Sequence, residues 1–484
     1  MPHNEIRFRT TTPVPAHAEI DQAALLARFA AIRQALHVPT DFPADVTAEA
    51  ERAAHEADLP ERDETAVPFV TIDPVGSMDL DQALHIERAG DGYRVRYAIA
   101  DVPAFVAPEG PLDVETRRRV ETIYAPDERT PLHPPVLSEG AASLLPDQVR
   151  PAYVWDLHLE ADGNETGAQV YRARVRSTAR LDYAGVQTAV DDGTADEVLL
   201  LLKEVGERRI ALEAARGGAS LPLPEQEVTQ DQHGRFVLGF RPPVDAEDWN
   251  AQISLMTGMA AAQMMLRGKV GILRTMPPPD QGAVARFRRQ ARALGVDWPR
   301  SERYGDFIRR LDLTDPRQLA LVHEATSLFR GAGYTAFEGD LPQQQEHAAV
   351  AAPYAHVTAP LRRLVDRFGL VVCAALTAGE EVPAWVRSAL STLPETMKAG
   401  DSRAKAVERA CTDAVEAAVM ASRVGETFSA DVVDVDPKRA GVTVQLADPA
   451  IVTRAKGDAG LGEEVRVRLD AADVASGTIT LTVV

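Results

Sequence analysis

The stretch TIDPVGSMDLDQAL, residues 71–84, joins the end of an apolar strand to the start of the next and places three aspartates within nine positions. Asp79 and Asp81 are two residues apart, so in an extended chain their side chains project from the same face. Asp73 lies across the intervening turn. Carboxylates this close raise one another's pKa unless a cation or a shared proton compensates them. Because Mg²⁺ and Mn²⁺ prefer carboxylate oxygens, the sequence predicts a metal site at these three aspartates.

Two other uses of these aspartates fit the sequence less well. A calcium-binding helix–loop–helix motif requires D-x-D-x-D-G with a glutamate at the twelfth position, and the spacing here differs from it. A phosphatase that forms an aspartyl phosphate could use the pair in DLD, but no neighbouring motif supplies the rest of that chemistry. The structural alternative, in which the carboxylates only cap turns, stays open.

A second stretch, YAHVTAPLRRLVDRFG, combines a predicted helix start with arginines. Pro360 in the first turn and Thr358 as a cap would direct free backbone N–H groups and the positive end of the helix dipole outward. Arg362 and Arg363 then lie in that turn, and the planar guanidinium suits phosphate. The sequence predicts an anion site here, with an Arg362–Asp366 ion pair as the structural alternative.

The composition indicates a globular protein of several domains. With 484 residues the chain is too long for one hydrophobic core, and 45% hydrophobic with 26% charged residues is typical of globular chains. The apolar stretch 368–376 is far shorter than the roughly 20 residues that cross a bilayer. Cys373 and Cys411 lie in apolar or helical contexts and predict buried free thiols, which suits a reducing compartment. We therefore expect a cytoplasmic monomer that does not enter membranes.

The net charge of −20 argues against a nucleic-acid partner, because binding to a polyanion depends on counterion release by lysine and arginine. Charge acts locally, however, and arginines gather in residues 286–294, 300–310 and 361–367. The first two segments are equally well explained as solvated faces of helices. The overall acidity thus weakens a nucleic-acid function without excluding it.

The two ends of the chain carry different patterns. Helical periodicity at 20–36 and 43–57 predicts an N-terminal helical module over residues 1–65, either a helix–turn–helix unit or a packing element. Four or five short alternating runs predict a small β-barrel of the OB type over residues 426–484. Phe428 is the only aromatic residue of this barrel, so a structural cap is the alternative to a nucleic-acid platform.

Residues 66–425 form a central region in which the two-residue period of strands gives way to helical patterns. The run at 67–73 predicts a strand, and the following alternation predicts a hairpin that turns at 89–92. Helices are predicted further along the chain near 194–216, 246–266, 280–294, 360–378 and 398–424. The expected fold class is therefore α+β, with a mixed α/β central domain between the helical module and the barrel.

The order of motifs resembles one family. TIDPVGSMDLDQAL is followed by YAIADV, LPDQVRPA, ARGGASLPLPEQEV and YAHVTAPLRR. In order and spacing this series resembles the catalytic domain of the ribonuclease II/ribonuclease R (RNB) exoribonucleases, from about residue 40 to 425. The resemblance implies processive 3′→5′ hydrolysis of single-stranded RNA to nucleoside 5′-monophosphates. It also implies that the terminal barrel is an RNA-binding OB domain.

The resemblance assigns roles to individual residues. The family's acidic metal cluster falls on the three aspartates of the opening stretch, with Asp81 central to catalysis. The arginine that contacts the phosphates falls on Arg362, a glutamate of the last helix falls on Glu408, and the aromatic residue that clamps the terminal base falls on Tyr124. Two metal ions about 4 Å apart would activate water and stabilise the leaving oxygen. A half-buried tyrosine that anchors its loop is the alternative for Tyr124.

The chain also departs from the family pattern. Gln82 stands where the family has a fourth aspartate; its amide could offer an oxygen to water or to a sugar hydroxyl. Ala251 and Gln252 replace an acidic pair, and Ala359 replaces a serine. A catalytically weakened relative that binds RNA without degrading it is therefore the alternative function.

The region before the central domain predicts a difference in substrate access. Typical family members carry two cold-shock barrels there, whereas the residues before Ala66 are too few for two barrels and have helical patterns. We expect a more open entrance, which would admit structured RNA with a 3′ overhang.

Overall fold

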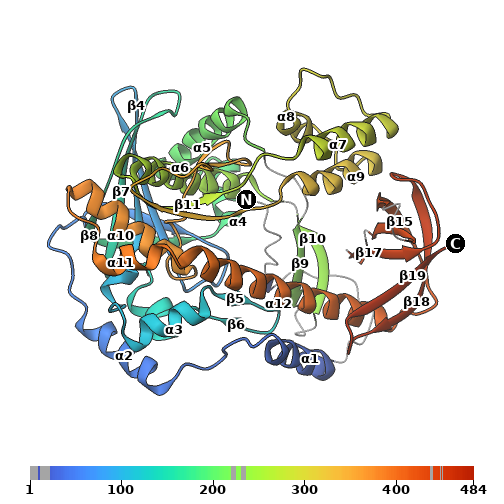
Figure 1. Ribbon diagram of the computed structural model, residues 1–484, viewed down its shortest axis with the longest axis horizontal. Coiled ribbons are helices and arrows are strands. Elements are labelled where there is room, and N and C mark those ends of the chain that lie inside the picture. The colour runs from blue at the N-terminus through green and yellow to red at the C-terminus, as the bar shows by residue number, and fades with distance from the viewer. Residues whose placement is uncertain are drawn as a thin grey trace.

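The computed structural model describes residues 9–10, 22–219, 225–230, 236–241, 243–435, 440–446, 448–449 and 451–484. Its described helices are α1 (Gln22–Ala35), α2 (Ala44–Glu56), α3 (Pro111–Arg119), α4 (Tyr183–Asp191), α5 (Glu197–Arg216), α6 (Asp245–Gly268), α7 (Gln281–Ala293), α8 (Tyr304–Arg309), α9 (Pro316–Ala325), α10 (Leu364–Ala378), α11 (Ala384–Leu390) and α12 (Leu393–Ala421). Its described strands are β1 (Arg9–Thr10), β2 (Phe69–Ile72), β3 (Gln82–Ala89), β4 (Gly92–Ala100), β5 (Ile123–Tyr124), β6 (Arg129–Thr130), β7 (Val149–Leu159), β8 (Glu165–Leu181), β9 (Glu225–Gln230), β10 (Phe236–Arg241), β11 (Val270–Thr275), β12 (Gly333–Glu338), β13 (Glu346–His347), β14 (Ala352–Pro353), β15 (Thr427–Asp434), β16 (Val442–Leu446), β17 (Ile451–Lys456), β18 (Glu464–Asp473) and β19 (Thr478–Val483). Two closed five-stranded barrels lie at opposite ends of the molecule, with helices around and between them (Figure 1).

The first barrel positions the acidic stretch. Its strands follow the order β2-β3-β4-β7-β8, and β8 closes the barrel by pairing in parallel with β2. β2 ends at Ile72 and β3 begins at Gln82, so residues 73–81 connect two neighbouring strands. The predicted hairpin that turns at 89–92 is confirmed, since β3 and β4 pair along their length. The barrel itself was missed by the sequence analysis, because β7 and β8 lay unrecognised within the mixed region.

Alternate residues of the barrel strands enter two different hydrophobic clusters, as the two-residue period of a strand requires. Leu84 and Tyr97 belong to the cluster that α5, α6 and α10 complete. Ala83 and Ala98 belong to a second cluster that includes side chains of α2 and α3. Both faces of this part of the sheet are therefore covered, and the loop that carries the aspartates is fixed to a rigid support.

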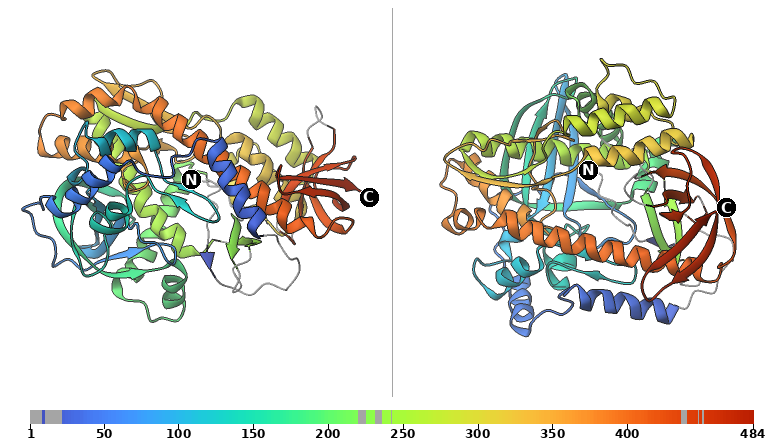
Figure 2. Two further views of the ribbon diagram at one scale, coloured as in Figure 1. Left: turned by 90° about the horizontal axis from the view of Figure 1, so that it is seen from below. Right: turned by 45° about the vertical axis from the view of Figure 1, so that its right-hand side comes forward.

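The predicted N-terminal helices are present but do not form one unit. α1 packs on α12, where Phe29 joins Val407 and Cys411 in one cluster. α2 packs on α3, and its Val46 and Ala50 belong to another cluster. The two helices lie apart in Figures 1 and 2. The choice between a helix–turn–helix unit and a packing element stays a prediction; residues 20 and 21 of the first predicted helix lie outside the described part.

The C-terminal barrel agrees with the sequence prediction. β15-β16-β17-β19-β18 form a closed barrel, and α12 runs through the molecule toward it (Figure 1). Phe428, its only aromatic residue, is 6% exposed and packs in the barrel core. Any RNA contact of this barrel therefore depends on polar and charged side chains rather than on stacking.

The remaining expectations from the central region are met with shifted boundaries. Helices α5, α6, α7 and α12 match the predicted segments, although α12 begins at Leu393 rather than near 398. Cys373 and Cys411 are free thiols with 0% and 1% exposure, and burial raises the pKa of the Cys411 thiol to about 12. Within the described part of the chain, no helix is both long and apolar enough to span a membrane.

Candidate active site

Asp81 is the most buried carboxylate of the acidic stretch. It is 4% exposed, and its Oδ1 accepts a 2.7 Å hydrogen bond from the backbone N–H of Leu361. Arg362 Nε lies 3.6 Å from its Oδ2. Burial raises the pKa of the Asp81 carboxyl well above its usual range, the charges of Asp79 and Asp366 raise it further, and Arg362 and the Leu361 N–H oppose the shift. The charged form of Asp81 is therefore only partly compensated by the protein.

The segment that meets Asp81 is a turn and not the predicted helix start. α10 begins at Leu364, so Arg362 precedes its first turn. The backbone of this segment is held by distant partners instead: Thr122 N–H donates to the Arg362 carbonyl at 3.0 Å, and Leu364 N–H donates to Val120 O at 2.9 Å. Arg363 has extended backbone angles (φ −133°, ψ 127°), so the helix cannot run on continuously from Pro360.

Two further contacts fix this turn. Burial lowers the pKa of His133 to about 3, so the ring is neutral and its Nδ1–H donates to the Leu361 carbonyl at 3.0 Å. The predicted cap Thr358 does not cap the helix; its Oγ1 lies 2.8 Å from the Ser254 hydroxyl. Asp366 accepts a 2.7 Å hydrogen bond from the Ala359 N–H. The chain is thus held on both sides of Leu361 before the helix starts.

The two arginines of the turn have different partners. Arg363 forms a bidentate pair with Asp366, with both N–O distances 2.9 Å. Arg362 faces Asp81 and keeps one third of its side chain exposed. The sequence alternative that paired Arg362 with Asp366 is therefore wrong, because Arg363 takes that place. A role of Arg363 in RNA binding stays a prediction, and its guanidinium is committed to Asp366.

Gln82 links the barrel to the same turn. Its Nε2 donates to the Thr358 carbonyl at 2.7 Å, and its Oε1 accepts a 2.5 Å hydrogen bond from the Tyr97 hydroxyl. The amide therefore uses both ends within the protein. A carboxylate at this position could not donate to Thr358, so the departure from the family pattern supplies a structural bond. Its expected contact with water or sugar stays a prediction.

Asp79 is held by a residue that the sequence analysis missed. Arg129 on β6 donates through Nη1 to Asp79 Oδ1 and through Nη2 to Glu139 Oε1. Arg129 lies opposite Tyr124 in the β5–β6 hairpin, and the two Cα positions are direct partners. The only sequence signal was a single arginine five residues after the predicted aromatic contact, which by itself indicates nothing about an acidic partner 50 residues away.

The three predicted metal ligands lie near one another without forming a ready set. Burial raises the pKa of Tyr97, the charges of Asp73 and Asp81 raise it further, and the charge of Asp79 raises the pKa of Asp81. Among the described residues, however, no group of three or more His, Cys, Asp or Glu side chains could hold a metal ion as arranged. The donor chemistry fits a hard cation, and a guanidinium already serves as the cation at Asp79. The metal assignment stays a prediction.

The remaining predicted contacts lie on neighbouring elements. Tyr124 ends β5 and is 38% exposed, as a base-stacking residue must be. Glu408 lies on α12, where its carbonyl accepts from the Thr412 hydroxyl at 3.0 Å. α12 packs against β5, so the helix of Glu408 adjoins the strand of Tyr124. Their assigned roles remain predictions.

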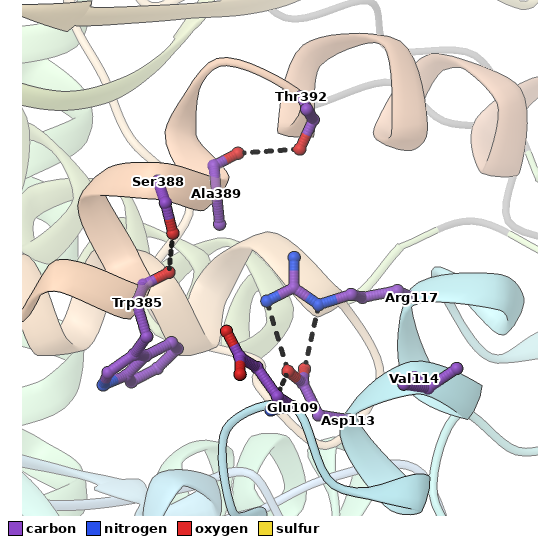
Figure 3. Close-up of a pocket in the computed structure, with 8 residues that line it drawn as sticks. All are labelled: Glu109, Asp113, Val114, Arg117, Trp385, Ser388, Ala389 and Thr392. Carbon is purple, nitrogen blue, oxygen red and sulfur yellow. Dashed lines mark hydrogen bonds and ion pairs between the residues drawn. The ribbon is translucent and has the colours of Figure 1, made fainter.

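A cavity of about 260 Å³ lies elsewhere, between α3 and α11 (Figure 3). Its lining includes Asp113, Trp385 and Arg117, and Arg117 Nε donates to Asp113 at 3.1 Å. None of the predicted site residues is among those that line it. The candidate site is thus defined by the contact of residues 79–82 with residues 358–363, not by this cavity.

Two family models match the chain. The RNB domain model matches residues 61–375, and the RNase II-type exonuclease C-terminal S1 domain model matches residues 426–484. The chain belongs to the RNB family. The quoted motif at 215–228 falls within the first match, although residues 220–224 lie outside the described part of the structure.

Individual relatives extend the comparison. The chain is 29% identical over 314 residues to ribonuclease R of Escherichia coli, a match that covers 62% of this chain and 38% of that protein. Mycoplasma genitalium RNase R in complex with ribose-methylated single-stranded RNA has a TM-score of 0.86 at 18% identity, and covers 100% of this chain and 86% of its own. Its complex with double-stranded RNA has a TM-score of 0.82. Yeast Ssd1, described as a pseudonuclease, has a TM-score of 0.63 at 16% identity over 84% of this chain and 51% of its own.

Proposed function

We propose that this protein is a 3′→5′ exoribonuclease that hydrolyses single-stranded RNA processively to nucleoside 5′-monophosphates. The observation that carries the proposal is the docking of residues 358–363 onto Asp81 and Gln82. This contact brings a half-buried arginine, Arg362, to the buried carboxylate of Asp81 from about 280 positions away. RNB-family membership supports the same reaction class. A cytoplasmic location, a monomeric state and use of RNA with a 3′ overhang remain predictions.

In this proposal the residues of the chain have separate tasks. Arg362, next to Asp81 and one third exposed, neutralises charge on the reacting phosphate. Tyr124 stacks on the terminal base and sets how short the product becomes. The Leu361 N–H holds Asp81, and His133 holds the turn through the Leu361 carbonyl. Gln82 links the turn to the barrel through the Thr358 carbonyl.

Asp73, Asp79 and Asp81 would hold divalent cations, Mg²⁺ or Mn²⁺. When bound, such ions supply an activated water and stabilise the leaving 3′-oxygen, as in two-metal hydrolysis. A cation would also lower the cost of keeping the buried Asp81 charged.

The direct test is digestion of a 5′-labelled oligoribonucleotide with Mg²⁺ or Mn²⁺. The proposal expects a descending ladder that EDTA abolishes, and no ladder from the Asp81→Asn protein made in parallel. An oligodeoxyribonucleotide of the same sequence serves as the substrate control. Absence of cleavage with both metals at protein concentrations that bind the RNA would contradict the proposal.

A catalytically weakened RNA-binding relative is the second candidate. It is favoured by the engagement of Asp79 with Arg129 and by the amide at position 82. This candidate predicts RNA binding in a filter assay with no metal-dependent shortening of the RNA. The same digestion therefore separates the two functions.

A further inference from the structure

The guanidinium of Arg129 takes the position of a cation in the acidic loop. It bridges Asp79 and Glu139, which come from separate segments of the fold. Charge-assisted hydrogen bonds of this kind are among the stronger polar contacts in proteins. A carboxylate oxygen that accepts from a guanidinium has less electron density and less room for a metal ion. Among the described residues, no group of three or more His, Cys, Asp or Glu side chains is arranged to hold a metal ion while this contact is present.

We propose that Arg129 and a divalent cation compete for Asp79, so that Arg129 must leave Asp79 before the metal site can form. The inference rests on the proposed function only in assigning a metal to these aspartates. Arg129 then sets the concentration of divalent cation at which the metal site fills. Removal of the guanidinium should then strengthen metal binding and not weaken it.

The surroundings of Arg129 allow this exchange. Its side chain is 26% exposed, and that of Asp79 is 12% exposed, so solvent and ions reach the pair. Glu139 is 33% exposed and provides a second partner on which Arg129 can remain after it releases Asp79. The hairpin that carries Arg129 has only two residues in each strand, so its side chain can move without disturbing the barrel. Asp81 differs, because a backbone N–H that cannot leave holds its Oδ1.

The test measures metal binding directly. Free Mn²⁺ is followed by electron paramagnetic resonance during titration of the full chain, in the absence of RNA. We expect Arg129→Gln to bind Mn²⁺ about tenfold more tightly than the wild type, and Arg129→Lys about threefold, because one ammonium cannot bridge two carboxylates as a guanidinium does. Unchanged or weaker binding by a folded Arg129→Gln protein would overturn the proposal; if that variant does not fold, Arg129→Lys decides in the same way.

Two controls separate competition from a general change of charge. Arg150 donates to the carbonyls of Gly140 and Ser143, so Arg150→Gln removes one positive charge from the same neighbourhood without freeing Asp79. It should leave the Mn²⁺ affinity within twofold of the wild type. In an Asp79→Asn background, Arg129→Gln should give no gain. A gain that persists in that background would show that Arg129 acts at a distance, which contradicts competition.

These outcomes are distinct from those of the nuclease test. Tighter Mn²⁺ binding by Arg129→Gln together with no RNA cleavage by any variant would support the exchange and contradict the nuclease. RNA cleavage by the wild type together with an unchanged Mn²⁺ affinity in Arg129→Gln would support the nuclease and overturn the exchange.

Discussion

Asp79 and Asp81 leave the same loop two residues apart, yet their surroundings differ in kind. Asp81 is buried, and its partners are a backbone N–H and an arginine from residues 361 and 362. Asp79 is held by the side chain of Arg129, which lies in a short hairpin. Asp81 is therefore held by a backbone N–H, which cannot move away without disturbing the fold. Asp79 is paired with a side chain, which can move to another partner. We call Asp81 the permanent element of the site, and Asp79, which in our proposal binds a metal ion only after Arg129 leaves it, the conditional element.

The largest expected effect comes from the permanent element. Asp81→Asn keeps the size of the side chain and an acceptor for the Leu361 N–H but removes its charge. We expect cleavage to fall by about 10³-fold or more, as when a main source of transition-state stabilisation is lost. RNA affinity should hold or rise, because a charge that repels phosphate is gone. Single-turnover rates and filter binding measure the two effects, and near-wild-type cleavage would remove Asp81 from the site.

The second largest effect is expected on the free energy of unfolding, which should depend on pH through the buried carboxyl of Glu121. The backbone of Glu121 pairs with that of Arg363 in an isolated antiparallel β-bridge, and burial together with the charge of Asp401 raises the pKa of the Glu121 carboxyl to about 7 from 4.5. A raised pKa favours the protonated form in the folded state, so the stability it gives is full below pH ~4.5 and is lost as pH rises through about 7. Relative to wild type, Glu121→Gln should unfold almost equally at pH 4 and be more stable at pH 8, by up to ~3 kcal/mol.

Urea unfolding at several pH values in metal-free buffer measures this difference. Glu51→Gln is the control, since Glu51 is an exposed glutamate on α2. A pH-independent difference between Glu121→Gln and wild type would mean that Glu121 is charged in the folded protein throughout this range.

A somewhat smaller effect is expected at Arg362. Arg362→Ala removes the half-buried cation beside Asp81, and turnover should fall by about 10²-fold with a modest change in RNA affinity. Arg362→Lys should recover part of the rate, because the charge returns without the fork of donors. The measurement is a comparison of kcat with the dissociation constant for RNA. A large loss of affinity with unchanged kcat would make Arg362 a binding residue only.

The smallest effect concerns the hairpin that carries Arg129. Tyr124→Ala removes the predicted base stacking, worth about 1–3 kcal/mol, and should weaken RNA binding by about tenfold. The variant should also release longer end products, which denaturing gels can size. Tyr124→Phe keeps the ring and should leave product length unchanged. Equal product lengths for all three proteins would show that Tyr124 only anchors its hairpin.

Local patterns were sufficient to predict many of the elements. The hairpin at 89–92, the C-terminal barrel and the buried thiols of Cys373 and Cys411 follow from alternation and composition. The start of α10 was predicted wrongly at Pro360, although proline and threonine there match a helix start. In the folded chain residues 361 and 362 form a turn bonded to Asp81 and Thr122, and Arg363 is extended, so the helix begins only at Leu364.

The sequence by itself determined the kinds of groups in the site: a cluster of aspartates, two arginines, and the helices and strands that carry them. Tertiary structure alone decided the partners, because Asp81 meets Leu361, and Asp79 meets Arg129, across 280 and 50 positions of chain. The spacing of hydrophobic residues predicts which face of a helix or strand is buried. It does not predict which distant side chain will pack against that face. The choice of Arg363 over Arg362 for Asp366 has the same origin, since neighbouring residues differ only in the direction that the closed fold gives them.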